Sequence, residues 1–184
     1  PGIVRVSTVS TRLLSGGGNN GRVNLPGRSW DDASRADFNT VGEGFFETLR
    51  IPIVAGRAIE QRDIRPTADV AVVDELFAKR FFPNENPLGR RFGLSPTDNN
   101  RYEIVGVAGN SRYNTLRGDA VPALYEPYRP GTTIHFAIRT TMDSSRLAEE
   151  VRRAVASLDP AVPVTEFHTQ TALIDRLLRT ERLL

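Results

Sequence analysis

Cysteine is absent from this sequence, lysine occurs once, at Lys79, and the two histidines are His135 and His168. Without cysteine, the chain has no thiol nucleophile, no thiolate metal ligand and no disulfide. This composition suits an extracytoplasmic location, where stray thiols oxidise, although many cytosolic proteins share it. No apolar run approaches the ~20 residues that a membrane-spanning helix needs, and no signal peptide is recognisable.

A strong charge imbalance is also missing. The 24 basic and 22 acidic residues leave a formal net charge of +2. That excess is too small to indicate a nucleic-acid partner, and no basic run interleaved with aromatic residues supports one. The length of 184 residues and the 39% hydrophobic content indicate one domain or two small ones with a real core.

Both ends of the sequence lie inside predicted elements. The first residues, "PGIVRVSTVS", begin almost within a strand, and the last, "RTERLL", stop within a helical pattern. We therefore treat the chain as an excised domain and expect its parent protein to continue in both directions.

Hydrophobic periodicity predicts the elements between these ends. Period-two alternation and short apolar runs indicate strands at 3–9, 35–41, 70–73, 90–94, 101–110, 123–128, 132–140 and 162–167. Helical spacing indicates helices within 42–52, at 75–82, from a cap at 143–145 to 158, and from 169 or 171 onward. The apolar faces of the last two helices are Leu147, Val151, Ala154, Val155 and Leu158, then Leu173, Ile174, Leu177 and Leu178.

Two stretches lack such periodicity. "SGGGNNGRVNLPGRSWDD", residues 15–32, is predicted to be a long mobile loop because of its glycines, its asparagines and Pro26. It does not indicate a phosphate loop, since neither a Gly-Lys-Ser/Thr ending nor a following helix is present. Residues 51–69 are predicted to be an irregular connection.

No constellation of residues indicates catalysis. Neither histidine has a partner at metal-ligand spacing, and there is no G-x-S-x-G elbow. A Ser-His-Asp triad assembled in space stays open, because such triads are not contiguous in sequence. Glu75 and the pair Glu149–Glu150 are interpreted as solvated helix charges. We therefore expect no enzyme, and no catalytic, cofactor-binding or metal-binding residue.

The most informative stretch is "DELFAKRFFPNENPLGRRF", residues 74–92. Asp74 is predicted to cap a helix that Pro83 ends. Pro87 fixes φ, and Gly89 permits a positive φ before the next strand. Its density of turn signals indicates a structural rather than a chemical role.

This stretch carries a family resemblance. "VAVVDELFAKRFFPNENPLGRRF", followed by "YEIVGVAGNSRYNTLRGDAVPALYEPY", resembles the periplasmic core domain of MacB-like ABC transporter permeases, in particular the orphan branch that lacks a fused ATPase. The flanking "VGEGFFETLRIPIVAGRAI" and the closing residues from "IRTTMDSSRLAEEV" onward agree with it.

The resemblance implies an α+β fold in two parts. An α/β sandwich of β-α-β units (porter-like) would comprise residues 1–66 and 131–184. An inserted small, mixed β-rich subdomain (sabre-like) would comprise residues 67–130.

The resemblance also implies a location and partners. The domain would lie on the periplasmic face of the inner membrane, between membrane helices of the parent permease. It would couple movement of those helices to engagement of a substrate or partner protein, without a cofactor. The implied partners are a separate cytoplasmic ABC ATPase, a periplasmic adaptor protein and, in a homodimer of the full-length permease, a second copy.

Two alternatives stay open: a soluble extracytoplasmic binding or adaptor module, and a hydrolase. A hydrolase predicts a pocket with converging polar groups and perturbed pKa values. A permease domain predicts a packed body without such a pocket. It also predicts that the two termini emerge side by side, which a free-standing module does not require.

Overall fold

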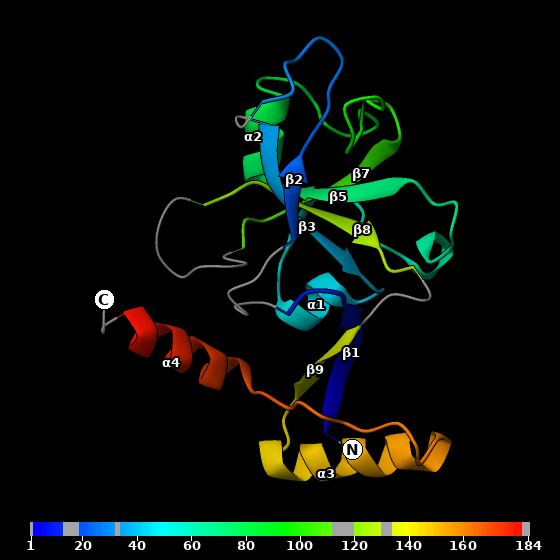
Figure 1. Ribbon diagram of the computed structural model, residues 1–184, viewed down its shortest axis with the longest axis vertical. Coiled ribbons are helices and arrows are strands. Elements are labelled where there is room, and N and C mark those ends of the chain that lie inside the picture. Colours follow the sequence, from blue (N-terminus) through cyan, green and yellow to red (C-terminus); the bar gives the residue numbers. More distant parts are fainter. Residues whose placement is uncertain (1, 13–18, 32–33, 112–119, 130–133, 182–184) are drawn as a thin grey trace.

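One mixed β-sheet passes through the molecule (Figure 1). The computed structural model describes residues 2–12, 19–31, 34–111, 120–129 and 134–181. Within them the strand order is β4-β7-β5-β8-β3-β1-β9, with β2 beside β3 and β6 beside β7. The strands are β1 (Ile3–Val9), β2 (Asn19–Arg22), β3 (Arg35–Val41), β4 (Ile53–Gly56), β5 (Val70–Asp74), β6 (Arg91–Phe92), β7 (Tyr102–Ala108), β8 (Ala123–Pro127) and β9 (His135–Thr140). The helices are α1 (Phe45–Leu49), α2 (Glu75–Phe81), α3 (Ser144–Leu158) and α4 (Gln170–Glu181), with a short 3₁₀ turn at Gln61–Asp63.

The central strands are buried on both faces. On β5, Val72 packs in an apolar cluster with Phe45 and Phe46 of α1, whereas its neighbours Ala71 and Val73 pack in a second cluster with α2. Because side chains alternate along a strand, the two clusters lie on opposite faces of the sheet. The unbroken apolar run of β5 is therefore what a strand covered on both faces requires. This mixed sheet with helices on its faces confirms the α+β fold class.

The stretch 74–92 folds largely as its sequence predicts. Asp74 caps α2 by accepting the backbone N–H of Phe77 at 2.7 Å. Gly89 adopts φ +76°, so its predicted conformational role is confirmed. β6 pairs antiparallel with β7, so the two strands predicted at 90–94 and 101–110 form a hairpin. The periodicity of the predicted helix also turns Leu76 inward with Phe77 and Phe81, but Leu76 is only half-buried.

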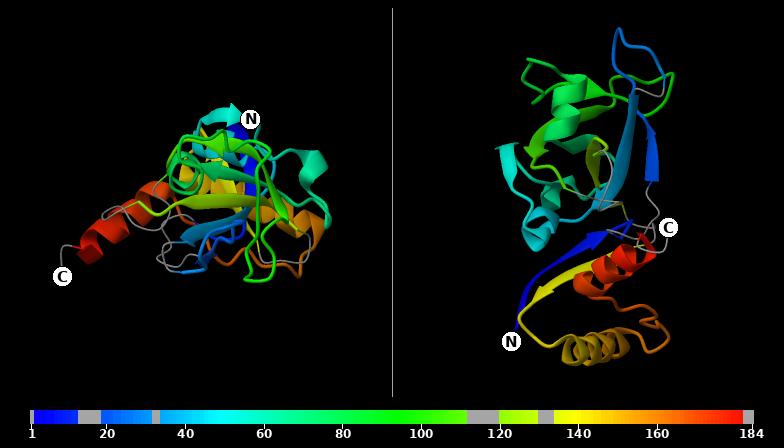
Figure 2. Two further views of the ribbon diagram at one scale, coloured as in Figure 1. Left: turned by 90° about the horizontal axis from the view of Figure 1, so that it is seen from above. Right: turned by 90° about the vertical axis from the view of Figure 1, so that its left-hand side faces the viewer.

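β1 and β9 form a two-stranded ribbon that projects from the body (Figures 1 and 2). The strands pair over nearly their full length, from Ile3↔Thr140 to Val9↔His135. β1 meets β3 at a single register pair, Val9↔Val41. Several large apolar side chains of the β1–β9 ribbon are between 46% and 62% exposed: Ile3, Val4, Val6 and Phe136.

Helix α3 lies across the free end of the β1–β9 ribbon, and α4 lies to one side (Figures 1 and 2). Leu147 of the predicted apolar face is buried, but Leu158 is 88% exposed. The inward-facing prediction is therefore wrong for the end of α3. The helix crosses the end of the ribbon, so its burial falls from Leu147 through the half-buried Val151 and Val155 to the exposed Leu158.

Residues 162–167, predicted to be a strand, form none. Their alternation of apolar and polar residues fits a strand, but a strand also needs a hydrogen-bonded partner. In the structure the segment returns from α3 toward α4 as an extended coil (Figure 1). The closing β-α-β unit expected from the sequence is thus not formed here.

Two predicted irregular stretches contain strands. Residues 19–22 of the glycine-rich loop form β2 against β3, and Val23 and Leu25 behind it are buried. Residues 53–56 form β4 against β7. Both strands are short, and β2 is polar, so each is specified by its partner more than by its own pattern. Residues 15–18 and 32 of the predicted loop lie outside the described residues.

The division into two subdomains stays a prediction. The strands of both proposed parts share one sheet, because β3 pairs in parallel with β8 over five residue pairs from Asp37↔Ala123 to Val41↔Pro127. β4, from the first part, also pairs with β7 of the proposed insert.

The described ends of the chain do not lie side by side. Gly2 lies at the free end of the β1–β9 ribbon, where Thr141 donates its N–H to the Gly2 carbonyl at 2.9 Å. Helix α4 ends away from that point in all three views (Figures 1 and 2). The expected adjacency of the termini is therefore not met by the residues that the structure describes. No helix in this part of the chain is both long enough and apolar enough to cross a membrane.

Candidate functional site

Both histidines lie near one carboxylate. His168 Nε2 is 3.9 Å from Glu166 Oε2, and Arg12 forms an ion pair with the same carboxylate. Burial, followed by the positive charge of Arg12, lowers the pKa of His135. The described residues contain no group of three histidine, aspartate or glutamate side chains placed to hold a metal ion. The Arg12–Glu166 ion pair thus connects the segment before α4 to the residues just after β1.

The buried carboxylates serve structural roles. Burial favours protonation of Asp63, but the hydrogen bond from Arg57, the backbone N–H of Glu60 and the positive charges of Arg57 and Arg62 together outweigh it, so the pKa of Asp63 is lowered. Arg57 holds it with two bonds, Nη1–Oδ2 at 2.6 Å and Nη2–Oδ1 at 3.1 Å. Asp74 is 1% exposed, and burial raises its pKa to about 6. Its partner is the N-terminus of α2, so it is a cap and not a free acid.

A half-buried acid, Glu126, lies near the end of β8. Burial raises the pKa of Glu126, while a hydrogen bond with Tyr102 and the charges of Arg129 and Arg101 favour its ionised form. Burial also raises the pKa of Tyr102 to about 12. A residue with a perturbed pKa is a candidate catalytic group only if it opens into a cleft. Neither residue lines either of the two hollows described below.

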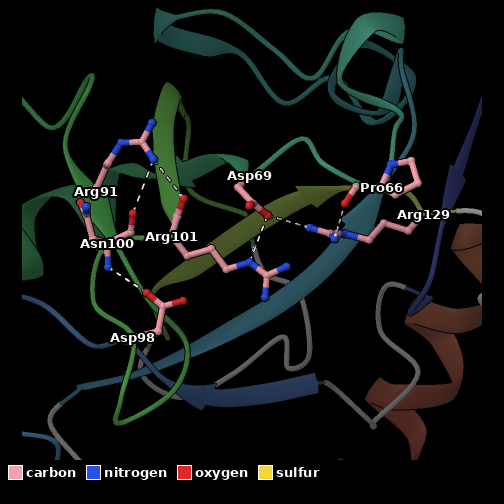
Figure 3. Close-up of polar contacts among 7 residues, drawn as sticks. All are labelled: Pro66, Asp69, Arg91, Asp98, Asn100, Arg101 and Arg129. Carbon is pink, nitrogen blue, oxygen red and sulfur yellow. Dashed lines mark hydrogen bonds and ion pairs between the residues drawn. The ribbon is translucent and has the colours of Figure 1, made fainter.

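The chain passes twice between the proposed subdomains, at the boundaries 66–67 and 130–131. Side-chain contacts near these two chain crossings link them to each other (Figure 3). Arg129, just before the boundary at 130–131, donates from Nη1 to the Pro66 carbonyl at 2.9 Å. Its Nη2 lies 3.3 Å from Asp69 Oδ1, to which Arg101 Nε also donates at 3.0 Å. Asp69 therefore joins the connection before β5, the start of β7 and the chain after β8.

A second set of hydrogen bonds joins the β1–β9 ribbon to helix α1. Arg139 of β9 donates from Nε to the Thr48 carbonyl at 2.7 Å, and its Nη2 donates to the same oxygen. Thr48 lies in the last turn of α1, where carbonyl groups lack intrahelical partners. A guanidinium at this end also opposes the helix dipole favourably. Arg139 thus adds a polar contact between the ribbon and α1 to the packing of Val9 with Phe45 and Phe46.

Two hollows on the surface of the described residues are partly open to solvent. The first, of about 470 Å³, lies between β1 and α1. It is lined by Val4, Arg5, Val6, Glu43, Gly44, Glu47, Ala58, Ile59 and Glu60. The second, of about 680 Å³, is lined by Gly27, Arg28, Ser29, Asp31, Ser34, Arg80 and Phe81. Ligand pockets usually have mostly apolar walls around a few convergent polar groups, and neither hollow has that character.

The described residues form one class of fold, a packed mixed sheet that carries a projecting two-stranded ribbon, with the ion pairs of Asp69 at the crossings between the proposed subdomains. The chain belongs to the MacB-like periplasmic core domain family, whose model matches residues 1–171.

Curated relatives are larger proteins of one kind. The chain is 30% identical over 122 residues to the macrolide export ATP-binding/permease protein MacB of Mannheimia succiniciproducens, covering 63% of this chain and 17% of that protein. It is 30% identical over 104 residues to the protein of the same name from Hahella chejuensis, covering 55% and 15%. The chain therefore spans about one sixth of the length of the relatives it matches.

Solved structures share the fold. The periplasmic region of MacB from Actinobacillus actinomycetemcomitans superposes with a TM-score of 0.59 at 18% identity, covering 84% of each chain. The extracellular domain of the noncanonic ABC-type transporter YknZ, from Gram-positive bacteria, gives 0.60 at 13% identity, covering 91% of this chain and 82% of that one. A domain of a putative permease from Porphyromonas gingivalis gives 0.59 at 12% identity, covering 96% and 84%.

The two fastening arginines were not singled out by sequence reasoning. Arg139 acts on a backbone carbonyl 91 residues away in the chain, and Arg129 on one 63 residues away. A carbonyl acceptor carries no residue signature, so no motif marks such a pair.

Proposed function

We propose that this chain is the extracytoplasmic, periplasmic domain of a MacB-like ABC transporter permease, and that it is not itself catalytic. The family match over residues 1–171 is the observation that carries the proposal. The named relatives are ATP-binding/permease proteins, and this chain aligns with only a small part of each. The resemblance to the orphan branch of the family implies that ATP binding would belong to a separate cytoplasmic ATPase.

The role proposed for the domain is mechanical. In this proposal a membrane helix of the parent permease precedes β1, as the family resemblance implies, and its movement would reach the β1–β9 ribbon first. The Arg139–Thr48 contact would pass it to α1 and so to the body. The Asp69 network would keep the two chain crossings moving together. The body would then engage a substrate or a partner such as a periplasmic adaptor, in a monomer or homodimer of the permease.

The experiment uses the uncut gene product. Membrane and soluble fractions would be separated, and intact spheroplasts treated with protease while this domain is followed by antibody. A cytoplasmic marker that stays intact controls for lysis. We expect membrane association and cleavage from outside. A soluble protein, or a membrane protein whose domain is protected until lysis, would contradict the proposal.

A further inference from the structure

The second hollow, of about 680 Å³, is lined by two arginines, Arg28 and Arg80. In the part of the chain that the structure describes, neither guanidinium forms an ion pair, whereas Arg90, Arg91 and Arg101 each pair with a carboxylate. A concave surface with an excess of one charge concentrates ions of the opposite sign. The hollow is therefore a candidate site for an anion.

The loop that carries Arg28 has a defined conformation. The backbone N–H of Arg28 donates to the Leu25 carbonyl at 3.2 Å, which closes a turn over the Pro-Gly pair between them. Proline followed by a glycine with positive φ, here +76° at Gly27, is the sequence of a type II turn. Leu25 is buried in the same apolar cluster as Phe81 of α2. The loop is thus anchored against α2.

One hydrogen bond positions the guanidinium of Arg28. Its Nη1 donates to the Arg80 carbonyl at 3.1 Å, in the last turn of α2, where carbonyl groups lack intrahelical partners. This bond caps the helix and also brings Arg28 next to the second arginine of the hollow. Capping engages only that nitrogen. In the described residues the other N–H donors of the Arg28 side chain, and all those of Arg80, have no protein acceptor.

The opposite wall of the hollow contains one acidic residue, Asp31. The buried Ser34 hydroxyl donates to the Ser29 carbonyl at 2.9 Å and lies 3.5 Å from Asp31 Oδ1. Arg22 donates from Nε to the Asp31 carbonyl at 3.1 Å, which places a third guanidinium beside this part of the loop. The lining as a whole therefore keeps a positive excess, and its polar groups are held in place before any ligand arrives.

We propose that this hollow binds a small soluble molecule through a phosphate group held by Arg28 and Arg80. A guanidinium matches the oxygens of a phosphate with two parallel hydrogen bonds. A phosphate ester has three terminal oxygens, which two arginines can share, whereas a carboxylate has only two. The polar lining that makes the hollow unlike a pocket for an apolar ligand suits such a group. Arginine side chains would bind it, and not the backbone of a glycine-rich loop at a helix N-terminus.

The position of the hollow favours a soluble ligand over a lipid headgroup. The loop of residues 23–31 and α2 lie at one end of the molecule, and Gly2 lies at the other (Figures 1 and 2). In the proposed permease a membrane helix precedes β1, so the hollow faces away from the membrane. This choice between two sources of phosphate rests on the proposed function, whereas the binding of phosphate itself does not.

Inorganic phosphate is the first probe, titrated into the whole chain at constant ionic strength while amide chemical shifts are followed. We expect shifts that saturate at residues 27–31 and 79–81. Arg80→Gln should weaken binding at least ~10-fold, because it removes charged hydrogen bonds to the ligand. It removes no side-chain contact within the described residues, so the test stands even if Arg28→Gln, expected to act likewise, disturbs the loop. Arg152→Gln, which removes an exposed and unpaired arginine of α3, is the matched control and should leave the affinity unchanged.

Asp31 supplies a prediction of opposite sign. Its carboxylate lines the hollow and repels a phosphate. Asp31→Asn removes the charge but keeps an oxygen for the Ser34 hydroxyl, so we expect phosphate to bind roughly 2–5-fold more tightly. An unchanged or lower affinity in this variant would show that the phosphate does not occupy the hollow.

Two further outcomes would overturn the proposal. If chloride at the same ionic strength produces the same shifts, or if Arg152→Gln loses as much affinity as Arg80→Gln, phosphate only screens the surface charge. Vesicles of phosphatidylglycerol form the second arm. Vesicle binding that depends on Arg28 and Arg80, without a response to inorganic phosphate, would assign the hollow to a lipid headgroup and would contradict the soluble source.

Discussion

Asp74 combines two opposing effects in one side chain. Its carboxylate caps α2, yet it is 1% exposed, and burial raises its pKa to about 6 from an ordinary value of 3.8. A carboxyl group with a raised pKa binds its proton more tightly in the folded state. Its contribution to stability is therefore most favourable below about pH 4 and is lost as pH rises through about 6.

Replacing Asp74 with asparagine should remove this dependence, because an amide caps a helix without carrying charge. A shift of about 2 pKa units corresponds to ~3 kcal/mol. We expect Asp74→Asn to gain on the order of 1–3 kcal/mol relative to the unmodified chain between pH 4.5 and pH 7.5. Urea unfolding of both proteins at the two pH values measures this difference. A difference independent of pH would show that Asp74 is ionised at both.

Gly89 isolates the cost of backbone conformation. It has φ +76°, and a Cβ placed there would meet nothing within 4 Å. Gly89→Val should therefore destabilise the domain by ~1–3 kcal/mol through backbone strain alone. Gly89→Asn, whose side chain tolerates a positive φ, should cost less. Equal melting temperatures for the valine variant and the unmodified chain would contradict this account.

At the scale of elements, the β1–β9 ribbon depends on its contact with α1. Arg139→Met removes both hydrogen bonds to the Thr48 carbonyl, and such a charged bond is worth ~1.5–3 kcal/mol. We expect faster amide exchange along β1 and β9, with little change in β5 or β7. Arg153→Met removes an equal charge from the exposed face of α3 and should leave exchange in the ribbon unchanged.

An outcome in which both variants accelerate exchange equally would assign the effect to net charge. Acceleration throughout the sheet would show that the ribbon and the body open together. Either result would contradict a fastening specific to Arg139.

Local signals explain which elements were predictable. α2 is bounded by Asp74 and Pro83, whose effects act within a few residues, and its position follows from the sequence almost to the residue. β2 and β4 carry no comparable signal, because each forms on an edge supplied by a distant strand. Residues 162–167 have the sequence pattern of a strand, but they pair with no other strand in the structure. The contacts of Arg129 and Arg139 could not be predicted, because each arginine donates to a backbone carbonyl, which no residue type marks in the sequence.

For the whole molecule, the β3–β8 pairing sets how the two proposed subdomains unfold. These strands belong to different proposed parts, yet they share a continuous parallel ladder. Phe45 and Phe92, buried in the two opposite clusters, then stabilise one cooperative unit. We expect calorimetry to show a single transition, lowered by either Phe45→Ala or Phe92→Ala, each costing ~3–5 kcal/mol.

Calorimetry could instead show two unfolding transitions, with each alanine variant lowering the temperature of only one of them. That result would mean that residues 67–130 unfold independently of the rest. That outcome would support two separate subdomains and would make the β3–β8 ladder an interface between them.

The pairing of β1 with β9 has a consequence for synthesis on the ribosome. β1 leaves the ribosome first, but its main partner ends at Thr140, and its contact with β3 is limited to Val9↔Val41. At the usual rates of translation, the nascent chain holds an unpaired apolar strand for on the order of ten seconds. During that interval Ile3, Val4 and Val6 are open to any passing chaperone or neighbouring chain. The ribbon that begins the sequence is thus among the last parts of the fold to close.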